Sequence, residues 1–181
     1  MSAWAIDPVP LTIMTLSLTA LWLAAGWHKL ADLKMFQHSL EAYDIAPRAA
    51  LPLLGRLLPV LELALAAGLL IAPIRPAAAV LGALLLAGYG AAIAVNLRRG
   101  RRDLDCGCLG FGVHSQISSA LVWRNGAAAV ASLSVGLLPR ALRASSWMDT
   151  WTIIAGAAVI ALLYLAAEGL RVAAQRVSRH G

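Results

Sequence analysis

The chain has 181 residues, of which 60% are hydrophobic and only 13% charged, and its mean hydropathy is +0.76. An ordinary soluble domain carries about 45–50% apolar and about 25% charged residues, so the composition excludes a water-soluble globule and favours a membrane protein. The formal charge of +6 and pI near 10.2 would suggest nucleic acid in a soluble domain. Here the basic residues flank apolar segments, which indicates membrane topology and anionic headgroups instead.

Five apolar stretches are each long enough to cross a bilayer, which takes about 20 residues. We expect spans at 11–30, 53–72, 76–97, 119–138 and 149–172, all within a single integral membrane domain, 1–181. The first stretch has no basic residue before it, unlike a cleaved signal peptide, so we expect it to be retained. The predicted fold class is therefore all-α, an integral membrane bundle of about five transmembrane helices with a four-helix core plus one.

The segment 31–46 is too polar to cross a bilayer. Its Phe36, Leu40 and Tyr43 recur at i, i+4 and i+7, with polar residues between them. This pattern predicts an amphipathic helix lying in the membrane interface after the first span, ended by Pro47.

Small side chains allow membrane helices to pack closely. The third apolar stretch carries Ala83, Ala87 and Ala91 in one row, with Gly88 and Ala92 beside them. We expect this row to face the neighbouring helices.

The basic residues are divided unevenly between the two ends of the five predicted spans. Twelve fall on the side that holds the C-terminus and three on the side that holds the N-terminus. Because short loops rich in Lys and Arg stay in the cytoplasm, we expect the N-terminus outside and the C-terminus in the cytoplasm.

The side with twelve basic residues also holds most of the unusual polar residues, which are His28, Lys29, Arg56, Arg124 and Asn125. The cations can simply extend to lipid headgroups, or they can reach into the bundle.

Glu62 lies about halfway along the second span. A charge at that depth costs on the order of 2.5–3.5 kcal/mol on insertion scales. We therefore expect an internal contact with Arg56, Arg124 or His28, the alternative being a passive neutral carboxyl.

The polar loop 98–118 carries Cys106-Gly107-Cys108. Cysteines at i and i+2 can close only a tight, strained disulfide, and strained exposed disulfides exchange readily. Three interpretations remain open from the residues alone. They are a redox pair, a soft-metal site in which His114 joins the two thiolates, and two inert thiols.

Several motifs in this order resemble the methylamine utilisation protein MauE family, which is related to the DoxX-like membrane proteins. They are Gly26-Trp27-His28-Lys29-Leu30, then Phe36, Leu40 and Tyr43, then Leu58-Pro59-Val60-Leu61-Glu62-Leu63, then the run Arg99 to Gly110 around the two cysteines, and finally Arg124-Asn125. The resemblance covers roughly residues 15–135.

This resemblance implies a multi-pass protein of the bacterial inner membrane that is needed to mature methylamine dehydrogenase. It further implies action beside a thioredoxin-like protein partner in forming the disulfides of the maturing enzyme subunit. Carried over, Cys106 and Cys108 are the redox pair, and Lys29, Glu62, Arg124 and Asn125 are the polar residues beside it.

The leading hypothesis is thus a membrane thiol–disulfide oxidoreductase or maturation factor, in which Glu62 and Arg124 adjust proton and charge near the two thiols. One alternative is a membrane transporter or binding protein for a soft metal or small molecule. Another is a non-catalytic assembly subunit. A quinone cofactor could dock among the apolar helices near Trp27 and Trp123, although no residue requires one.

Overall fold

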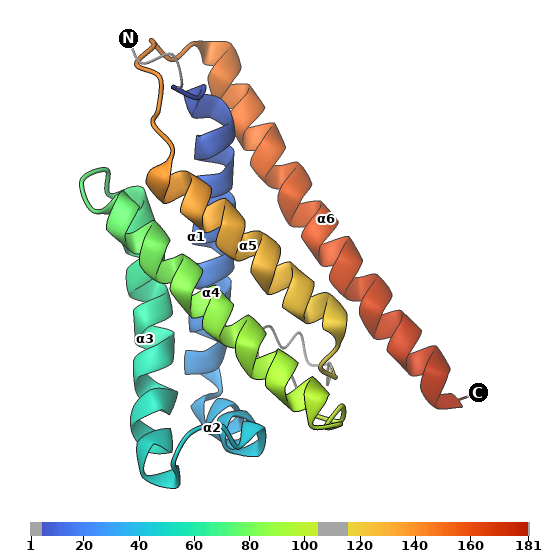
Figure 1. Ribbon diagram of the computed structural model, residues 1–181. Helices are drawn as coiled ribbons and strands as arrows, with labels where there is room; N and C mark the ends of the chain where they lie inside the picture. The colour runs from blue at the N-terminus through green and yellow to red at the C-terminus, as the bar shows by residue number, and fades with distance from the viewer. Residues whose placement is uncertain (1–4, 105–115, 181) are drawn as a thin grey trace.

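The computed structural model describes residues 5–104 and 116–180. Within these ranges the regular structure is helical, apart from isolated bridge residues such as the Ile6–Arg140 pair. Five helices are long and apolar enough to cross a membrane (Figure 1), which confirms the predicted all-α class and the number of spans. The elements are α1 (Pro8–Ala31), α2 (Leu33–Tyr43), η1 (Arg48–Ala50), α3 (Leu51–Leu70), α4 (Arg75–Arg98), α5 (Ser119–Leu137) and α6 (Trp147–His180).

The helix boundaries near the start of the chain follow from capping residues. Asp7 begins α1 by accepting a hydrogen bond from the Val9 amide at 2.9 Å, and Asp32 begins α2 in the same way through the Met35 amide at 3.0 Å. These carboxylates satisfy amides that have no partner within the helix. Asp44 then ends α2 in the left-handed conformation with φ of 50°.

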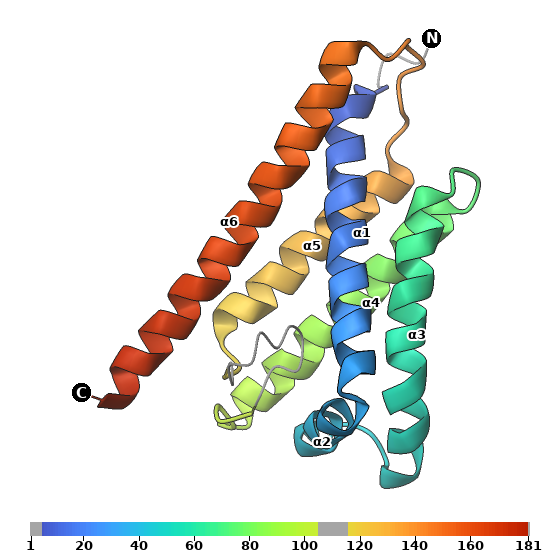
Figure 2. The same cartoon turned by 180° about the vertical axis from the view of Figure 1, so that it is seen from behind.

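The five long helices alternate in direction, so both ends of the bundle have a defined composition (Figures 1 and 2). One end holds α2, the ends of α1, α4 and α6 and the starts of α3 and α5, and we call it the basic face. The opposite end holds the start of α1 and the α5–α6 connection, and we call it the N-terminal face. Helix α2 lies across the ends of the spans on the basic face, where both views show it nearly end-on.

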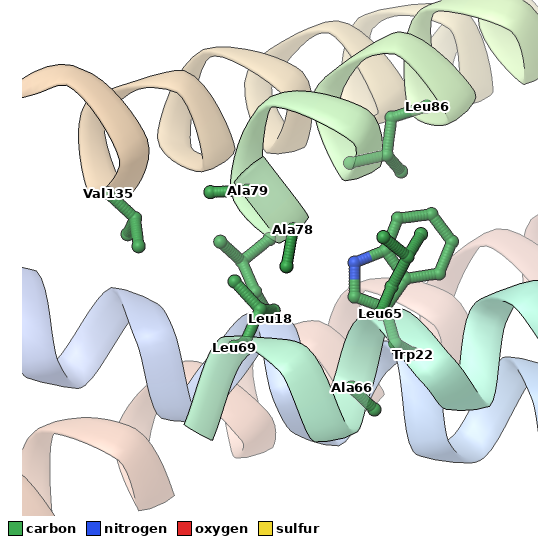
Figure 3. Close-up of a cluster of buried hydrophobic side chains, with 9 residues drawn as sticks. All are labelled: Leu18, Trp22, Leu65, Ala66, Leu69, Ala78, Ala79, Leu86 and Val135. Atoms are coloured by element: carbon green, nitrogen blue, oxygen red, sulfur yellow. The ribbon is translucent and has the colours of Figure 1, made fainter. Parts of the chain in front are cut away.

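The main core lies between α1, α3, α4 and α5 (Figure 3). Trp22 is its largest side chain and is almost completely buried. The other buried members are small or aliphatic and are Leu18, Leu65, Ala66, Leu69, Ala78, Ala79, Leu86 and Val135. These four helices form the four-helix core expected from the sequence, and α6 lies outside it.

The packing face of α4 differs from the expected one. Ala87, Gly88 and Ala91 are exposed, whereas Gly82 and Gly90 are buried against α5. A Cβ at Gly82 would lie 3.3 Å from Ser132 Oγ, and one at Gly90 would lie 3.5 Å from Asn125 Cβ. The closest approach therefore occurs where glycine leaves room, so the alanine row predicted for this contact is wrong except at Ala83, which is buried.

Helix α6 is a peripheral helix. None of the most apolar window within Trp147–Leu170 is buried. Its main contact is with α1, where a Cβ at Gly156 would lie 2.6 Å from Ile13 Cδ1. In a bilayer most of its surface therefore faces lipid.

An exposed ionic cluster joins the first and last spans on the N-terminal face. The Arg143 guanidinium donates to Asp7 Oδ2 at 2.9 Å and to Asp149 Oδ2 at 2.6 Å. The Ile6 amide also donates to the Pro139 carbonyl at 2.9 Å, which attaches the start of the chain to the α5–α6 connection. The hydrogen bond from Arg143 lowers the pKa of the Asp7 carboxyl below its ordinary value.

Candidate functional site

A buried polar cluster joins three spans of the bundle. Lys29 comes from the last turn of α1, Glu62 from the middle of α3 and Tyr89 from the middle of α4. Glu62 Oε1 accepts hydrogen bonds from Lys29 Nζ and, at 2.7 Å, from the Tyr89 hydroxyl. The Lys29 and Glu62 side chains are 4% and 0% exposed. We call this group the Lys29–Glu62–Tyr89 cluster.

Aromatic rings complete the environment of the Lys29 ammonium. Its Nζ lies 4.7 Å from the centre of the Tyr89 ring and 5.2 Å from that of Phe36 on α2. Cation–π attraction is strongest where the cation is removed from water. Lys29 therefore retains a favourable electrostatic environment in the bundle without reaching lipid headgroups.

One oxygen of the Glu62 carboxyl is not used by this cluster. Oε2 is buried, and no residue of the described part of the chain hydrogen-bonds to it. An unpaired polar atom in a dry interior is costly. Oε2 is thus the atom of the cluster with an unused hydrogen-bond acceptor position.

The prediction that Glu62 faces the interior is confirmed, but the partners predicted for it are wrong. Arg56 is exposed, Arg124 contacts α6, and His28 is partly exposed on α1. Lys29 is the partner because it lies at the correct depth, and its long side chain reaches the carboxylate on α3.

Arg124 belongs to a separate contact. Its Nη1 donates to the Tyr164 hydroxyl at 3.0 Å and to Glu168 Oε2 at 3.4 Å, and its guanidinium lies 5.5 Å from the centre of the Tyr164 ring. This contact joins α5 to α6 near the basic face. The structure therefore separates Arg124 from Glu62, although the sequence placed both beside the thiols.

Two buried asparagines lie toward the basic face. Asn125 Nδ2 donates to the Leu121 carbonyl within α5 at 2.8 Å. Asn96 is fully buried, and its Nδ2 donates to the Tyr43 carbonyl at 3.1 Å. The Arg101 amide in turn donates to the Asn96 carbonyl at 3.0 Å. Asn96 thus connects α4, the end of α2 and the start of the α4–α5 connection.

Cys106, Cys108 and His114 lie outside the described residues, so the structure assigns them no geometry. The described residues that flank this segment, Leu104 and Ile117, lie on the basic face. The Ile117 amide donates to the Leu104 carbonyl at 3.0 Å, and Ile117 is buried in a small apolar cluster with Tyr43, Ile93 and Leu121. The segment that carries both cysteines therefore begins and ends at neighbouring points on this face.

Tyr89 is the member of the cluster that was not predicted from the sequence. Its signal was a single phenol in the middle of a long apolar stretch, and a phenol in that position needs a polar partner for its hydroxyl. Phe36 belongs to the amphipathic pattern and to the family motifs in the sequence, but neither of them predicts its contact with Lys29. Within residues 5–104 and 116–180, no group of three or more His, Cys, Asp or Glu residues could hold a metal ion.

The fold and the cluster define a multi-pass, all-helical membrane protein with an ion pair buried in its bundle. Residues 7–139 match the model of a family described as methylamine utilisation protein MauE, and the chain belongs to this family.

Similar proteins span nearly the whole chain. It is 34% identical to the methylamine utilization protein MauE of Paracoccus denitrificans over 169 residues, which cover 93% of this chain and 90% of that protein. It is 37% identical to the protein of the same name in Paracoccus versutus, covering 84% and 82% of the two chains. For that of Methylophilus methylotrophus the identity is 33%, with 90% and 86% covered. No solved structure gives a significant match.

Proposed function

We propose that the protein matures a partner enzyme by thiol–disulfide exchange through Cys106 and Cys108. The observation that carries this proposal is the placement of the flanking residues. Leu104 and Ile117 are hydrogen-bonded to each other, and both belong to the apolar cluster at the end of α4. Both ends of the segment that carries the two thiols thus lie on the basic face, and in this proposal the exchange with a protein partner takes place at that face.

In this exchange, two electrons pass from the maturing subunit to a thioredoxin-like protein. The Cys106 and Cys108 thiols first reduce the disulfide of a thioredoxin-like protein through a mixed disulfide, and the pair becomes oxidised. A thiolate of the maturing subunit then attacks this disulfide, and its second thiol resolves the new mixed disulfide. The subunit gains a disulfide, the pair is reduced again, and two electrons have passed to the thioredoxin-like protein.

The maturing enzyme in this proposal is methylamine dehydrogenase. This assignment is supported by membership of the MauE family and by the names of the related proteins, which refer to methylamine utilisation. The same family resemblance suggests the inner membrane, and the excess of basic residues on the basic face favours the cytoplasm for that face. The N-terminal face would then lie outside.

Glu62 and Arg124 act as positioning residues in this proposal. Glu62 holds Lys29 and Tyr89 between α1, α3 and α4, and Arg124 holds α6 against the start of α5. A quinone is assigned no step. Trp27 and Trp123, the residues expected near it, are 72% and 81% exposed.

The test uses the two single variants Cys106→Ser and Cys108→Ser. We expect both to abolish maturation of the partner enzyme and one of them to accumulate a mixed disulfide that reductant releases. Ser115→Ala in the same segment is the matched control and should retain activity. Normal maturation with both cysteine variants would contradict the proposal.

A second measurement tests the redox state and the side of the membrane. Intact cells are treated with a membrane-impermeant thiol reagent before and after reduction, with the chain's only two cysteines as targets. Labelling that requires both reduction and cell permeabilisation supports an oxidisable pair on the cytoplasmic side. Stoichiometric Cu(I) uptake by the purified protein without any oxidised form would instead favour the soft-metal alternative.

A further inference from the structure

A hollow of about 410 Å³ lies between α2 and the start of α3 on the basic face. Its lining residues are Lys34, Gln37, His38, Glu41, Arg48, Leu51 and Pro52. From α2 come Lys34, His38 and Glu41 at i, i+4 and i+7, which form one polar row along the helix. The opposite side of α2 carries the buried Phe36 and Tyr43.

Helices α2 and α3 approach each other closely beside the hollow. A Cβ at Gly55 would lie 2.6 Å from Gln37 Cγ, so the glycine allows the Gln37 side chain to lie directly on α3. The hollow therefore lies at a contact where α2 packs closely on α3.

Three charged side chains line the hollow, those of Lys34, Glu41 and Arg48. Within the described ranges, Lys34, Glu41 and Arg48 have neither an ion pair nor a side-chain hydrogen bond. Two cations and one carboxylate leave a single positive charge on the lining. A ligand with one negative charge would neutralise the lining.

The surroundings point to a lipid rather than a free anion. Helix α2 lies across the ends of the spans on the basic face, and the ends of membrane spans are where headgroups are expected. Leu51 lines the hollow, and the adjoining turns of α3 expose Leu53 and Leu57 at 60% and 52%. A headgroup in the hollow would thus continue into acyl chains along an apolar helix surface.

We propose that this hollow binds the headgroup of phosphatidylglycerol. Lys34 and Arg48 contact the phosphate, and Glu41 and Gln37 accept hydrogen bonds from the glycerol hydroxyls. A zwitterionic headgroup would leave the net positive charge unbalanced, and a serine headgroup would bring its carboxylate toward Glu41.

The experiment measures lipid retention by native mass spectrometry of the full chain, released from phosphatidylcholine nanodiscs that contain phosphatidylglycerol or phosphatidylethanolamine. We expect phosphatidylglycerol to be retained preferentially. Lys34→Gln and Arg48→Gln should each weaken retention about fivefold, because a basic residue near a membrane surface contributes on the order of 1 kcal/mol. Arg98→Gln is the matched control, since Arg98 is exposed on the same face and does not line the hollow.

Three results would overturn the proposal. They are equal retention of phosphatidylethanolamine, an equal loss with Arg98→Gln, and displacement of the lipid by millimolar inorganic phosphate, which would indicate a site for the free anion. Because the exposed substitutions could still alter folding, thermal unfolding is measured in parallel. The variants should unfold like the wild type in phosphatidylcholine and should lack the stabilisation that phosphatidylglycerol gives the wild type.

Discussion

Lys29 and Glu62 form an ion pair in the interior of the bundle. Arg143 forms ion pairs with Asp7 and Asp149 at the N-terminal face. Both groups join α1 to other spans through ionic contacts, but only the first has lost its water. A buried pair becomes strongly destabilising when one partner is removed, while an exposed pair contributes little because water and salt screen it. Position within the fold, rather than the residue types, decides the energetic importance of each group.

The largest expected effect comes from Glu62→Ala, which leaves the Lys29 ammonium buried without its carboxylate. We expect a loss of about 3–5 kcal/mol in the free energy of unfolding. Denaturant-induced unfolding in detergent micelles measures it. The double variant Lys29→Met with Glu62→Leu removes both charges and should lose less than the single variant. If the double variant is the less stable of the two, the loss reflects packing and not an unpaired charge.

A smaller effect is expected from Tyr89→Phe. This change retains the ring 4.7 Å from the Lys29 ammonium and removes the hydroxyl that donates to Glu62 at 2.7 Å. A hydrogen bond to a charged group contributes about 1.5–3 kcal/mol. We expect the free energy of unfolding, measured in the same detergent micelles, to fall by this amount. Tyr89→Leu removes the ring as well and should cost more. Equal stability of Tyr89→Phe and the wild type would exclude the hydroxyl from the cluster's energetics.

The smallest effect is expected from Asp7→Asn in the exposed ionic cluster on the N-terminal face. The Arg143 hydrogen bond lowers the pKa of Asp7 in the folded protein. Its stabilising contribution is therefore fully present above the unfolded pKa, near 3.8, and is lost as the pH falls through the lower folded value. Asp7→Asn should reduce the acid dependence of thermal unfolding below about pH 4, and added salt should reduce the difference further.

The control for this measurement is Asp44→Asn, because Asp44 is exposed and its side chain makes no ion pair among the described residues. This variant should keep the acid dependence of the wild type. An equal change in both variants would indicate a general charge effect and contradict the role of Arg143.

The fold class could be predicted because hydropathy over some 20 residues reports directly on the ability to cross a membrane. The packing face of α4 could not, because alanine and glycine occur all around that helix. A periodic pattern does not distinguish Ala87, which is exposed, from Gly82, which is buried against α5. Only the position of the neighbouring helix decides which small residue is needed.

The internal contact of Glu62 could be predicted from the sequence, but its partner could not, because the partner also depends on how the helices pack. The depth of Glu62 indicated an internal contact, but its partner lies 33 positions earlier in the chain. Lys29 is at a helix end, where the side chain can reach outward to headgroups or inward to the carboxylate. The carboxylate and the aromatic rings of Phe36 and Tyr89 favour the inward direction, and their arrangement depends on three packed helices.

Helix α6 has a mechanical consequence that its lipid exposure does not suggest. Its 34 residues measure about 51 Å at 1.5 Å per residue, whereas a hydrocarbon core of about 30 Å takes at most about 39 Å of helix at a 40° tilt. At least two turns of α6, counted over both of its ends, must therefore extend past the hydrocarbon region. These turns place the ends of α6 among the lipid headgroups, so a change in bilayer thickness would alter the tilt of α6 relative to the four-helix core.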